Sequence, residues 1–276
     1  MKRTILVLTL SLLICGLVSL PAKAMAEDVL MMATTTSTDN TGLLNVLAPE
    51  FKKDTGIELK WTAVGTGKAL ELGKNCDVDV LLVHAPEAEK KFVDAGSGVD
   101  RTEVMYNDFV VVGPESDPAK IKGKSVPEAM KAIADSKAVF VSRGDNSGTH
   151  KKEQELWKVA GLAPEKDEWY VQAGQGMIAT LNMAAEKNGY SMTDRGTYIK
   201  YEADAKGNPP LKILVEGDKN LFNQYSVIAI NPEKCKSAKY DLAKKFSDWM
   251  ASPKIQKFIA DFKLLDKQLF TPNAKK

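Results

Sequence analysis

Histidine and cysteine are scarce in this chain, which has two histidines and three cysteines among 276 residues. His84 and His150 lie in separate segments, and no cysteines have the spacing of a structural zinc motif. We therefore expect neither a metal site nor a cofactor. So few histidines also leave few candidate general bases for a hydrolytic enzyme.

An excess of charge of one sign is also lacking. The formal net charge of +2 depends on the first 24 residues, which contain Lys2, Arg3 and Lys23 and no acid. The rest of the chain has 35 basic and 36 acidic residues, a net charge of −1. This balance argues against the basic surface that nucleic-acid binding needs, so we expect no nucleic-acid partner.

Long apolar runs are missing except near the N-terminus. There, a basic start and a largely apolar run over Ile5–Leu20 lead to the small-x-small pattern Ala22-Lys23-Ala24. This order predicts a signal peptide over residues 1–24, with a second possible cut after Ala26, and hence a periplasmic or secreted protein. A membrane anchor is the alternative, but the run is shorter than the ~20 residues of a membrane span. A lipoprotein signal at Cys15 ranks lower because an isoleucine precedes that cysteine.

Two cysteines, Cys76 and Cys235, remain after this cleavage. An exported protein meets an oxidising compartment, where the two can form a disulfide. Two independent buried thiols are equally consistent with the sequence.

Strand-like and helix-like runs alternate along the chain without an internal repeat. The expected strands are Val29–Ala33, Ile57–Val64, Val78–Val83, Asp108–Pro114, Ala138–Val141, Glu168–Gln172, Lys212–Val215 and Asn223–Ile230. The expected helices are Thr41–Asp54, Lys68–Lys74, Pro86–Ala95, Pro127–Ser136, Lys151–Trp157, Gly176–Asn188, Ala238–Ala251 and Pro253–Phe262. Gly189–Arg195 is turn-rich, and Thr197–Ile199 is a weak strand. The alternation predicts an α/β fold of mostly parallel sheets covered by helices.

A change of pattern near Asn107 predicts two lobes. The first lobe takes residues 27–107 and 222–276, and the second takes residues 108–221. A ligand then has a place between the lobes, near the carboxyl ends of the strands. We expect the lobes to close by hinge motion at residues 107–109 and 222–226.

The segment Ser142–His150, SRGDNSGTH, is the clearest functional signal. It joins a strand to a helix, where backbone N–H groups lack partners and can bind an anion. Arg143 adds a permanent charge with a donor fork, and Asp145 is expected to pair with it and orient it. An N-capped helix with a surface arginine is the alternative interpretation.

Three further strand-to-helix turns also indicate an anion-binding site. Thr34–Thr38 has more hydroxyl side chains than a helix cap requires. Val64–Lys68 has two glycines but fails the phosphate-loop pattern, since Ala69 stands where Ser or Thr is needed. Gly174–Met177 has glycines that let the backbone approach a ligand. Four helix N-termini could thus face one cleft and balance a dianion together with the arginine.

A secreted hydrolase with Ser147 as nucleophile is the competing function of another class. Its surroundings, Gly144-Asp145-Asn146-Ser147-Gly148, match neither the G-D-S-G nor the G-x-S-x-G pattern. No base and orienting acid fit with this serine, so we expect no enzyme activity.

Three motifs together resemble the extracytoplasmic tungstate-binding proteins of ABC importers: Thr34–Ser37, Ser142–His150 and Gly174–Met177. The resemblance covers essentially the whole mature chain. It implies a two-lobed periplasmic-binding-protein fold of type II, a monomer that delivers tungstate to a membrane permease, and no cofactor. By position, Thr34, Arg143 and Thr149 would be the main contacts. The expected supporting contacts are Thr35, Ser37, Thr66, Ser147 and Gly176.

Phosphate and molybdate are the alternative ligands. Tungstate is fully deprotonated at neutral pH and needs donors only, whereas phosphate keeps a proton on some molecules and favours a carboxylate acceptor. Asp145 is the only obvious acceptor near these motifs, so tungstate is favoured over phosphate. No motif separates tungstate from molybdate.

Overall fold

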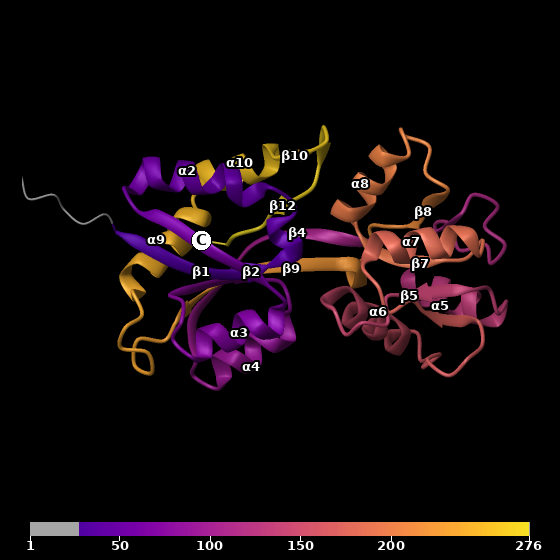
Figure 1. Ribbon diagram of the computed structural model, residues 1–276, viewed down its shortest axis with the longest axis horizontal. Coiled ribbons are helices and arrows are strands. Elements are labelled where there is room, and N and C mark those ends of the chain that lie inside the picture. Colours follow the sequence, from indigo (N-terminus) through magenta and orange to yellow (C-terminus); the bar gives the residue numbers. More distant parts are fainter. Residues whose placement is uncertain (1–27, 276) are drawn as a thin grey trace, which may run out of the picture.

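The computed structural model describes residues 28–275 and shows two lobes side by side (Figure 1). The predicted signal peptide, residues 1–24, lies outside the described residues. Over residues 28–275, no helix combines the length and the apolar character needed to cross a membrane.

The first lobe is built before residue 107 and completed by the C-terminal part of the chain. Its strands are β1 (Val29–Thr35), β2 (Glu58–Val64), β3 (Val80–Val83), β12 (Thr271–Pro272) and parts of β4 (Gly98–Pro114) and β9 (Phe222–Ile230). Its helices are α1 (Thr36–Asp39), α2 (Leu43–Thr55), α3 (Thr66–Lys74), α4 (Pro86–Asp94), α9 (Tyr240–Met250) and α10 (Pro253–Asp261). A small hairpin of β10 (Lys263–Leu264) and β11 (Lys267–Gln268) follows α10.

The sheet of the first lobe has the strand order β12-β4-β9-β3-β1-β2. Strands β2, β1 and β3 are parallel, while β9 and β4 run antiparallel to their neighbours. Helices α2, α9 and α10 pack on one face around Phe51 and Phe246, and α3 and α4 cover the other (Figure 1). The parallel strands therefore end together at the edge that faces the second lobe.

The second lobe lies between the two long strands in the sequence. Its strands are β5 (Phe140–Ser142), β6 (Tyr170–Gln172), β7 (Ser191–Asp194) and β8 (Leu211–Val215). Its helices are α5 (Val126–Asp135), α6 (Gly148–Val159), α7 (Met177–Glu186), α8 (Arg195–Asp204) and the 3-10 turn η1 (Lys219–Leu221). β7 and β8 pair with β4, and β5 pairs in parallel with β6. Helices α5 and α6 share one core around Trp157, and α7 and α8 contribute to another.

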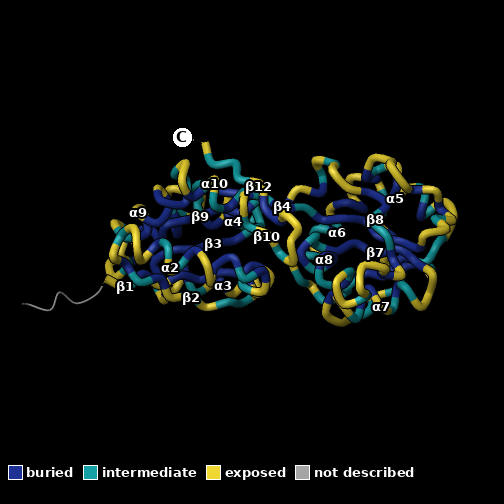
Figure 2. The backbone as a smooth tube through the Cα atoms, turned by 90° about the horizontal axis from the view of Figure 1, so that it is seen from above, coloured by how far each residue is buried: buried dark blue, intermediate teal, exposed yellow. Residues whose placement is uncertain are grey.

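Strands β4 and β9 pass from one lobe to the other (Figure 1). Met105 and Tyr225 belong to the core of the first lobe, whereas Phe109 and Leu221 belong to the core of the second. Figure 2 shows a buried centre in each lobe with the two strands between them. The predicted lobe boundaries at residues 107/108 and 221/222 remain a prediction, as does the hinge motion itself.

Three elements differ from the sequence-based expectation. The segment Gly189–Arg195 contains strand β7, and Thr197–Ile199 belongs to helix α8 instead of a weak strand. Asp194 accepts a hydrogen bond from the backbone N–H of Thr197 and so starts that helix as its N-cap. The β-branched residues of this segment favour a strand, so the sequence did not predict the start of this helix. Strand β4 is also longer than Asp108–Pro114, because it begins at Gly98.

Cys76 and Cys235 form a disulfide, which decides between the two alternatives that the sequence left open. Cys76 follows α3, and Cys235 lies in the loop after β9. Cys235 is buried in the apolar cluster beneath α3 and α4. The bond therefore joins two distant parts of the first lobe.

Candidate anion site between the lobes

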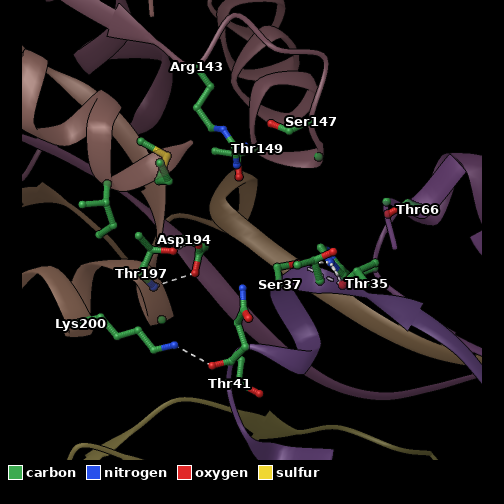
Figure 3. A pocket seen from close by; sticks show the side chains of 18 of the residues that line it. Thr35, Ser37, Thr41, Thr66, Arg143, Ser147, Thr149, Asp194, Thr197 and Lys200 are labelled. Atoms are coloured by element: carbon green, nitrogen blue, oxygen red, sulfur yellow. Dashed lines mark hydrogen bonds between the residues drawn. The ribbon is translucent and has the colours of Figure 1, made fainter. Parts of the chain in front are cut away.

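A cavity of about 600 Å³ lies between the lobes (Figure 3). Hydroxyl side chains line it from the first lobe (Thr35, Thr36, Ser37, Thr41 and Thr66) and from the second (Ser147, Thr149 and Thr197). Its charged lining residues are Arg143, Lys200, Asp194 and Asp204. Cavities that enclose drug-sized molecules have volumes of about 300–1,000 Å³. A single tetrahedral anion would therefore leave most of this space empty.

Four helices begin at the cavity wall. Thr36, Thr66, Gly148 and Met177 are the first residues of α1, α3, α6 and α7, and all four line the cavity. The first N–H groups of a helix have no partner within the helix, and its N-terminus has a partial positive charge. The arrangement thus concentrates positive potential in one place.

The second-lobe wall is the loop between β5 and α6. Gly144 has a left-handed backbone (φ 60°), and a Cβ at this position would lie 2.7 Å from Cβ of Gln172. Only glycine fits this turn without strain. Asp145 accepts hydrogen bonds from Arg143 Nη2 at 2.5 Å and from Ser147 N at 3.1 Å. The predicted Arg143–Asp145 pair is confirmed.

Arg143 is directed towards the cavity beside Thr149, across from Thr35 and Ser37 (Figure 3). Its side chain is 22% exposed, and its Nε is buried without a hydrogen-bond partner among the described residues. A buried donor without a partner is costly, so this guanidinium suits an incoming acceptor.

Ser147 is an N-cap rather than a nucleophile. Its Oγ accepts from His150 N at 3.3 Å, and Nδ1 of His150 accepts from Asn146 N at 3.0 Å. The histidine therefore supports the loop and has no hydrogen bond to the serine hydroxyl through its ring. The geometry contains no nucleophile–base pair at this position.

The first-lobe wall has the same construction. Oγ1 of Thr35 accepts from Thr38 N at 3.1 Å and caps α1, and Ser37 Oγ lies 3.0 Å from it. Thr34 does not line the cavity: it is fully buried, and its hydroxyl donates to the carbonyl of Leu82 at 2.8 Å. Alternate residues of a strand point to opposite faces, so Thr35 faces the cavity in its place. The Thr34 hydroxyl is therefore turned away from the cavity in this structure, and the expected main contact by Thr34 stays a prediction.

Of the two remaining predicted contact residues in the glycine turns, one lines the cavity and the other does not. Thr66 lines the cavity, but Gly176 does not; the next residues along the chain, Met177 and Ile178, line it instead. Gly176 is the N-cap of α7, and its carbonyl accepts from Thr180 Oγ1 at 3.1 Å. The fourth turn thus brings an apolar side chain to the cavity instead of a glycine.

Sequence reasoning missed His84, which lines the cavity directly after β3. Its Nε2 lies 2.9 Å from Thr35 Oγ1 and 3.0 Å from Ser37 Oγ. Burial lowers the pKa of this imidazole below its ordinary value. Its place at the carboxyl end of a buried strand, next to the ends of β1 and β2, was the signal that could have found it.

Helix α8 was also missed, and it connects the two lobes. Lys200 Nζ donates to the carbonyl of Asn40 at 2.7 Å, at the end of α1, and Lys267 pairs with Glu202. Ile199 is 4% exposed and packs in the core of the first lobe. The helix therefore closes one side of the cavity.

The chain matches a known protein family and its curated members. The family model described as a PBP superfamily domain matches residues 22–254. The tungstate-binding protein TupA of Campylobacter jejuni is 56% identical over 239 residues, which cover 87% of this chain and 89% of that protein. The chain belongs to the TupA family within the PBP superfamily.

Two solved structures agree with this assignment. The tungstate-binding protein TupA from Desulfovibrio alaskensis is 70% identical, with a TM-score of 0.88 over 90% of this chain and 100% of that one. The tungstate ABC transporter structure from Geobacter sulfurreducens is 50% identical, with a TM-score of 0.74 over 86% of this chain and 100% of that one. The predicted α/β fold, a two-lobed periplasmic-binding-protein fold of type II, is confirmed. The expectation of mostly parallel sheets is wrong, because β4 pairs antiparallel with β9 in the first lobe and with β7 and β8 in the second.

Two carboxylates near the site of this TupA-family chain, Asp194 and Asp145, accept hydrogen bonds from neighbouring residues, whereas Asp204 lines the cavity without such a bond among the described residues. Asp194 accepts from Thr197 N at 2.8 Å and from Thr197 Oγ1 at 2.6 Å, one bond to each carboxylate oxygen. Asp145 accepts from Arg143 and Ser147. The hydroxyls, the guanidinium and the helix starts remain as donors. These donors suit an oxyanion.

Proposed function

We propose that this protein captures tungstate between its two lobes and delivers it to the permease of an ABC importer. One observation carries the proposal: donors from both lobes line a single cavity, while Asp145 and Asp194 accept hydrogen bonds from neighbouring residues. Membership of the TupA family supports the same ligand. The activity is binding and transport, without catalysis.

Binding would draw the lobes together. Thr35, Ser37 and Thr66 stand on the first lobe, and Arg143 and Thr149 on the second. An open cavity of about 600 Å³ is too large for one anion to contact all of them. Closure about β4 and β9 would bring both sets of donors to the oxygens.

The cellular setting is part of this proposal. A signal peptide over residues 1–24, a periplasmic location, a monomeric state and contact with a permease fit a protein that hands over a captured anion. The disulfide between Cys76 and Cys235 is consistent with an oxidising compartment. No cofactor is required, because the donors listed above act on the anion directly.

Titration calorimetry of the mature protein with tungstate, molybdate, phosphate and sulfate tests the function. We expect tight binding of tungstate and weaker binding of phosphate, because the carboxylates of Asp145 and Asp194 already accept hydrogen bonds from neighbouring residues. Molybdate shares the geometry and charge of tungstate, so it is the strongest competitor. Tight phosphate binding without tungstate binding would overturn the assignment.

A further inference from the structure

The imidazole of His84 uses both nitrogen atoms, one towards the cavity and one towards the inter-lobe strands. Nε2 lies within 3.0 Å of the hydroxyls of Thr35 and Ser37. Nδ1 lies 3.0 Å from Oδ1 of Asn223 on β9. Asn223 in turn donates from Nδ2 to Oδ1 of Asn107 on β4 at 2.7 Å. A chain of side-chain hydrogen bonds thus runs from the cavity wall to the two strands that join the lobes.

This chain selects one tautomer of His84. Because the amide nitrogen of Asn223 donates to Asn107, its oxygen faces the imidazole, and an amide oxygen can only accept. Nδ1 therefore carries the proton. In the neutral imidazole, Nε2 is then an acceptor and needs a hydroxyl proton from the cavity side.

Thr35 is the better donor to that nitrogen. Its Oγ1 accepts from Thr38 N at 3.1 Å and lies 2.6 Å from Thr38 Oγ1, so a proton donated by the Thr38 hydroxyl would fill its second acceptor site. Its own proton is then directed to Nε2 of His84 at 2.9 Å. The hydroxyl of Ser37 is left to donate into the cavity.

We propose that His84 is a positioning residue of the anion site, which orients the Thr35 and Ser37 hydroxyls and takes up a proton when a dianion binds beside them. This inference rests on the proposed function. A dianion near the imidazole favours its charged form. Nε2–H would then donate to Ser37 Oγ, which lies 3.0 Å away, and the proton of Thr35 would become available to the anion. Each His84 imidazole that becomes an imidazolium takes up one proton from solvent.

The groups around His84 are consistent with proton uptake by its imidazole. Asp194 on β7 is the carboxylate whose charge favours the imidazolium, and Tyr225 on β9 stacks on the ring with 4.7 Å between centroids. Glu89 on α4 accepts from the N–H of the next residue, Ala85. Arg143 lines the opposite wall. Burial lowers the pKa of His84 and so favours the neutral imidazole in the free site.

Proton uptake can be measured directly. The chain has only two histidines, so the untagged protein gives two imidazole Cε1–H signals to titrate by NMR with and without tungstate. We expect the pKa of His84 to rise in the complex, and tungstate affinity to increase as pH falls from 8 to 5.5. Calorimetry in buffers of different ionisation enthalpy should report net proton uptake on binding at the acidic end of that range.

Two substitutions separate the roles of the ring nitrogens. His84→Gln places a neutral acceptor near the position of Nε2, whereas His84→Asn reaches only towards Asn223. At pH 8 we expect Gln to bind tungstate within about threefold of the wild type, and Asn to bind roughly five- to tenfold more weakly, the effect of one lost hydrogen bond. Neither variant should show the pH-dependent gain. Thermal melts would establish that both are folded.

The outcomes distinguish this inference from the proposed function. A wild-type protein that does not bind tungstate at all would contradict the proposed function. Tight wild-type binding without proton uptake, or with the same uptake in His84→Gln, would overturn the role of His84 alone. Equal affinities of wild type and His84→Asn would do so as well.

Discussion

Asp145 holds Arg143 in place across two residues of the same loop, with 2.5 Å between the carboxylate Oδ2 and the guanidinium Nη2. The same carboxylate accepts from the backbone of Ser147, so it connects the arginine to the start of α6. The guanidinium is thereby oriented while its Nε stays without a partner among the described residues. An oriented but unsatisfied donor fork is well suited to an oxyanion.

Arg143→Lys should weaken tungstate binding by about 10- to 100-fold. Lysine keeps the charge but loses the planar fork and cannot replace a pair of charge-assisted hydrogen bonds. Calorimetry of the variant at neutral pH measures the loss, and circular dichroism checks the fold. Unchanged affinity would place Arg143 outside the anion contacts.

Lys200→Met should speed the release of tungstate about three- to tenfold. Lys200 donates to the carbonyl of Asn40 across the cavity, and a charged donor contributes more than a neutral hydrogen bond. Stopped-flow fluorescence follows the release rate. Lys158→Met, on the exposed side of α6, is the matched control for loss of a positive charge in the same lobe. Equal rates for both variants would argue against a bridging role.

Removal of the disulfide by Cys76→Ser and Cys235→Ser together should lower the free energy of unfolding by roughly 2–5 kcal/mol. The bond closes a long loop, with 159 residues of sequence separation. Urea denaturation measures the change, and intact mass with and without reductant confirms the loss of the bond. Cys76 precedes β3, whose other end leads to His84, so tungstate affinity should stay within about twofold. A large affinity loss in a folded variant would contradict this separation.

The buried Glu153 predicts how stability depends on pH. Burial raises its pKa to about 7, although Trp157 Nε1 and the Tyr170 hydroxyl both donate to its carboxylate. Between its ordinary value of 4.5 and about 7 the native state binds the proton and the unfolded chain does not. The stability gain is therefore complete below pH 4.5 and is lost as pH rises through about 7, an effect on the order of 3 kcal/mol.

Glu153→Gln should flatten this part of the stability profile, because the amide cannot ionise but can still accept from Trp157 and Tyr170. Glu155→Gln, an exposed position on the same helix, is the control and should leave the slope unchanged. Urea denaturation at pH 5 and pH 8 gives the comparison. Equal slopes for wild type and Glu153→Gln would show that the carboxyl has an ordinary pKa.

Most of the architecture could be predicted from the sequence because local signals agreed with the fold. Apolar strands such as β3 and β9 stand between polar helices that end at glycine or begin at proline, as at Gly56 and Pro86. Prediction failed where β-branched residues stand in a helix, at Thr197 and Ile199, since a tertiary cap and core contact outweigh their strand preference.

The loops that form the site were predicted, but several of the side chains that line it were not. The motif around Arg143 identified one wall, but strand alternation turned Thr34 inward and left Thr35 at the cavity. His84 and Lys200 depend on contacts 47 or more residues away in sequence, which no local pattern contains. The anion-binding chemistry was thus accessible from motifs, while the connection to the inter-lobe strands required the three-dimensional structure.

Crystallography of the mature protein with tungstate, using anomalous scattering at a tungsten absorption edge, tests the central claim most directly. We predict one tungsten peak between the lobes, with its oxygens within hydrogen-bond distance of Arg143 and Thr149 on one side and of Thr35 or Ser37 on the other. A tungsten peak held by one lobe alone, or none in the cavity under saturating tungstate, would contradict it.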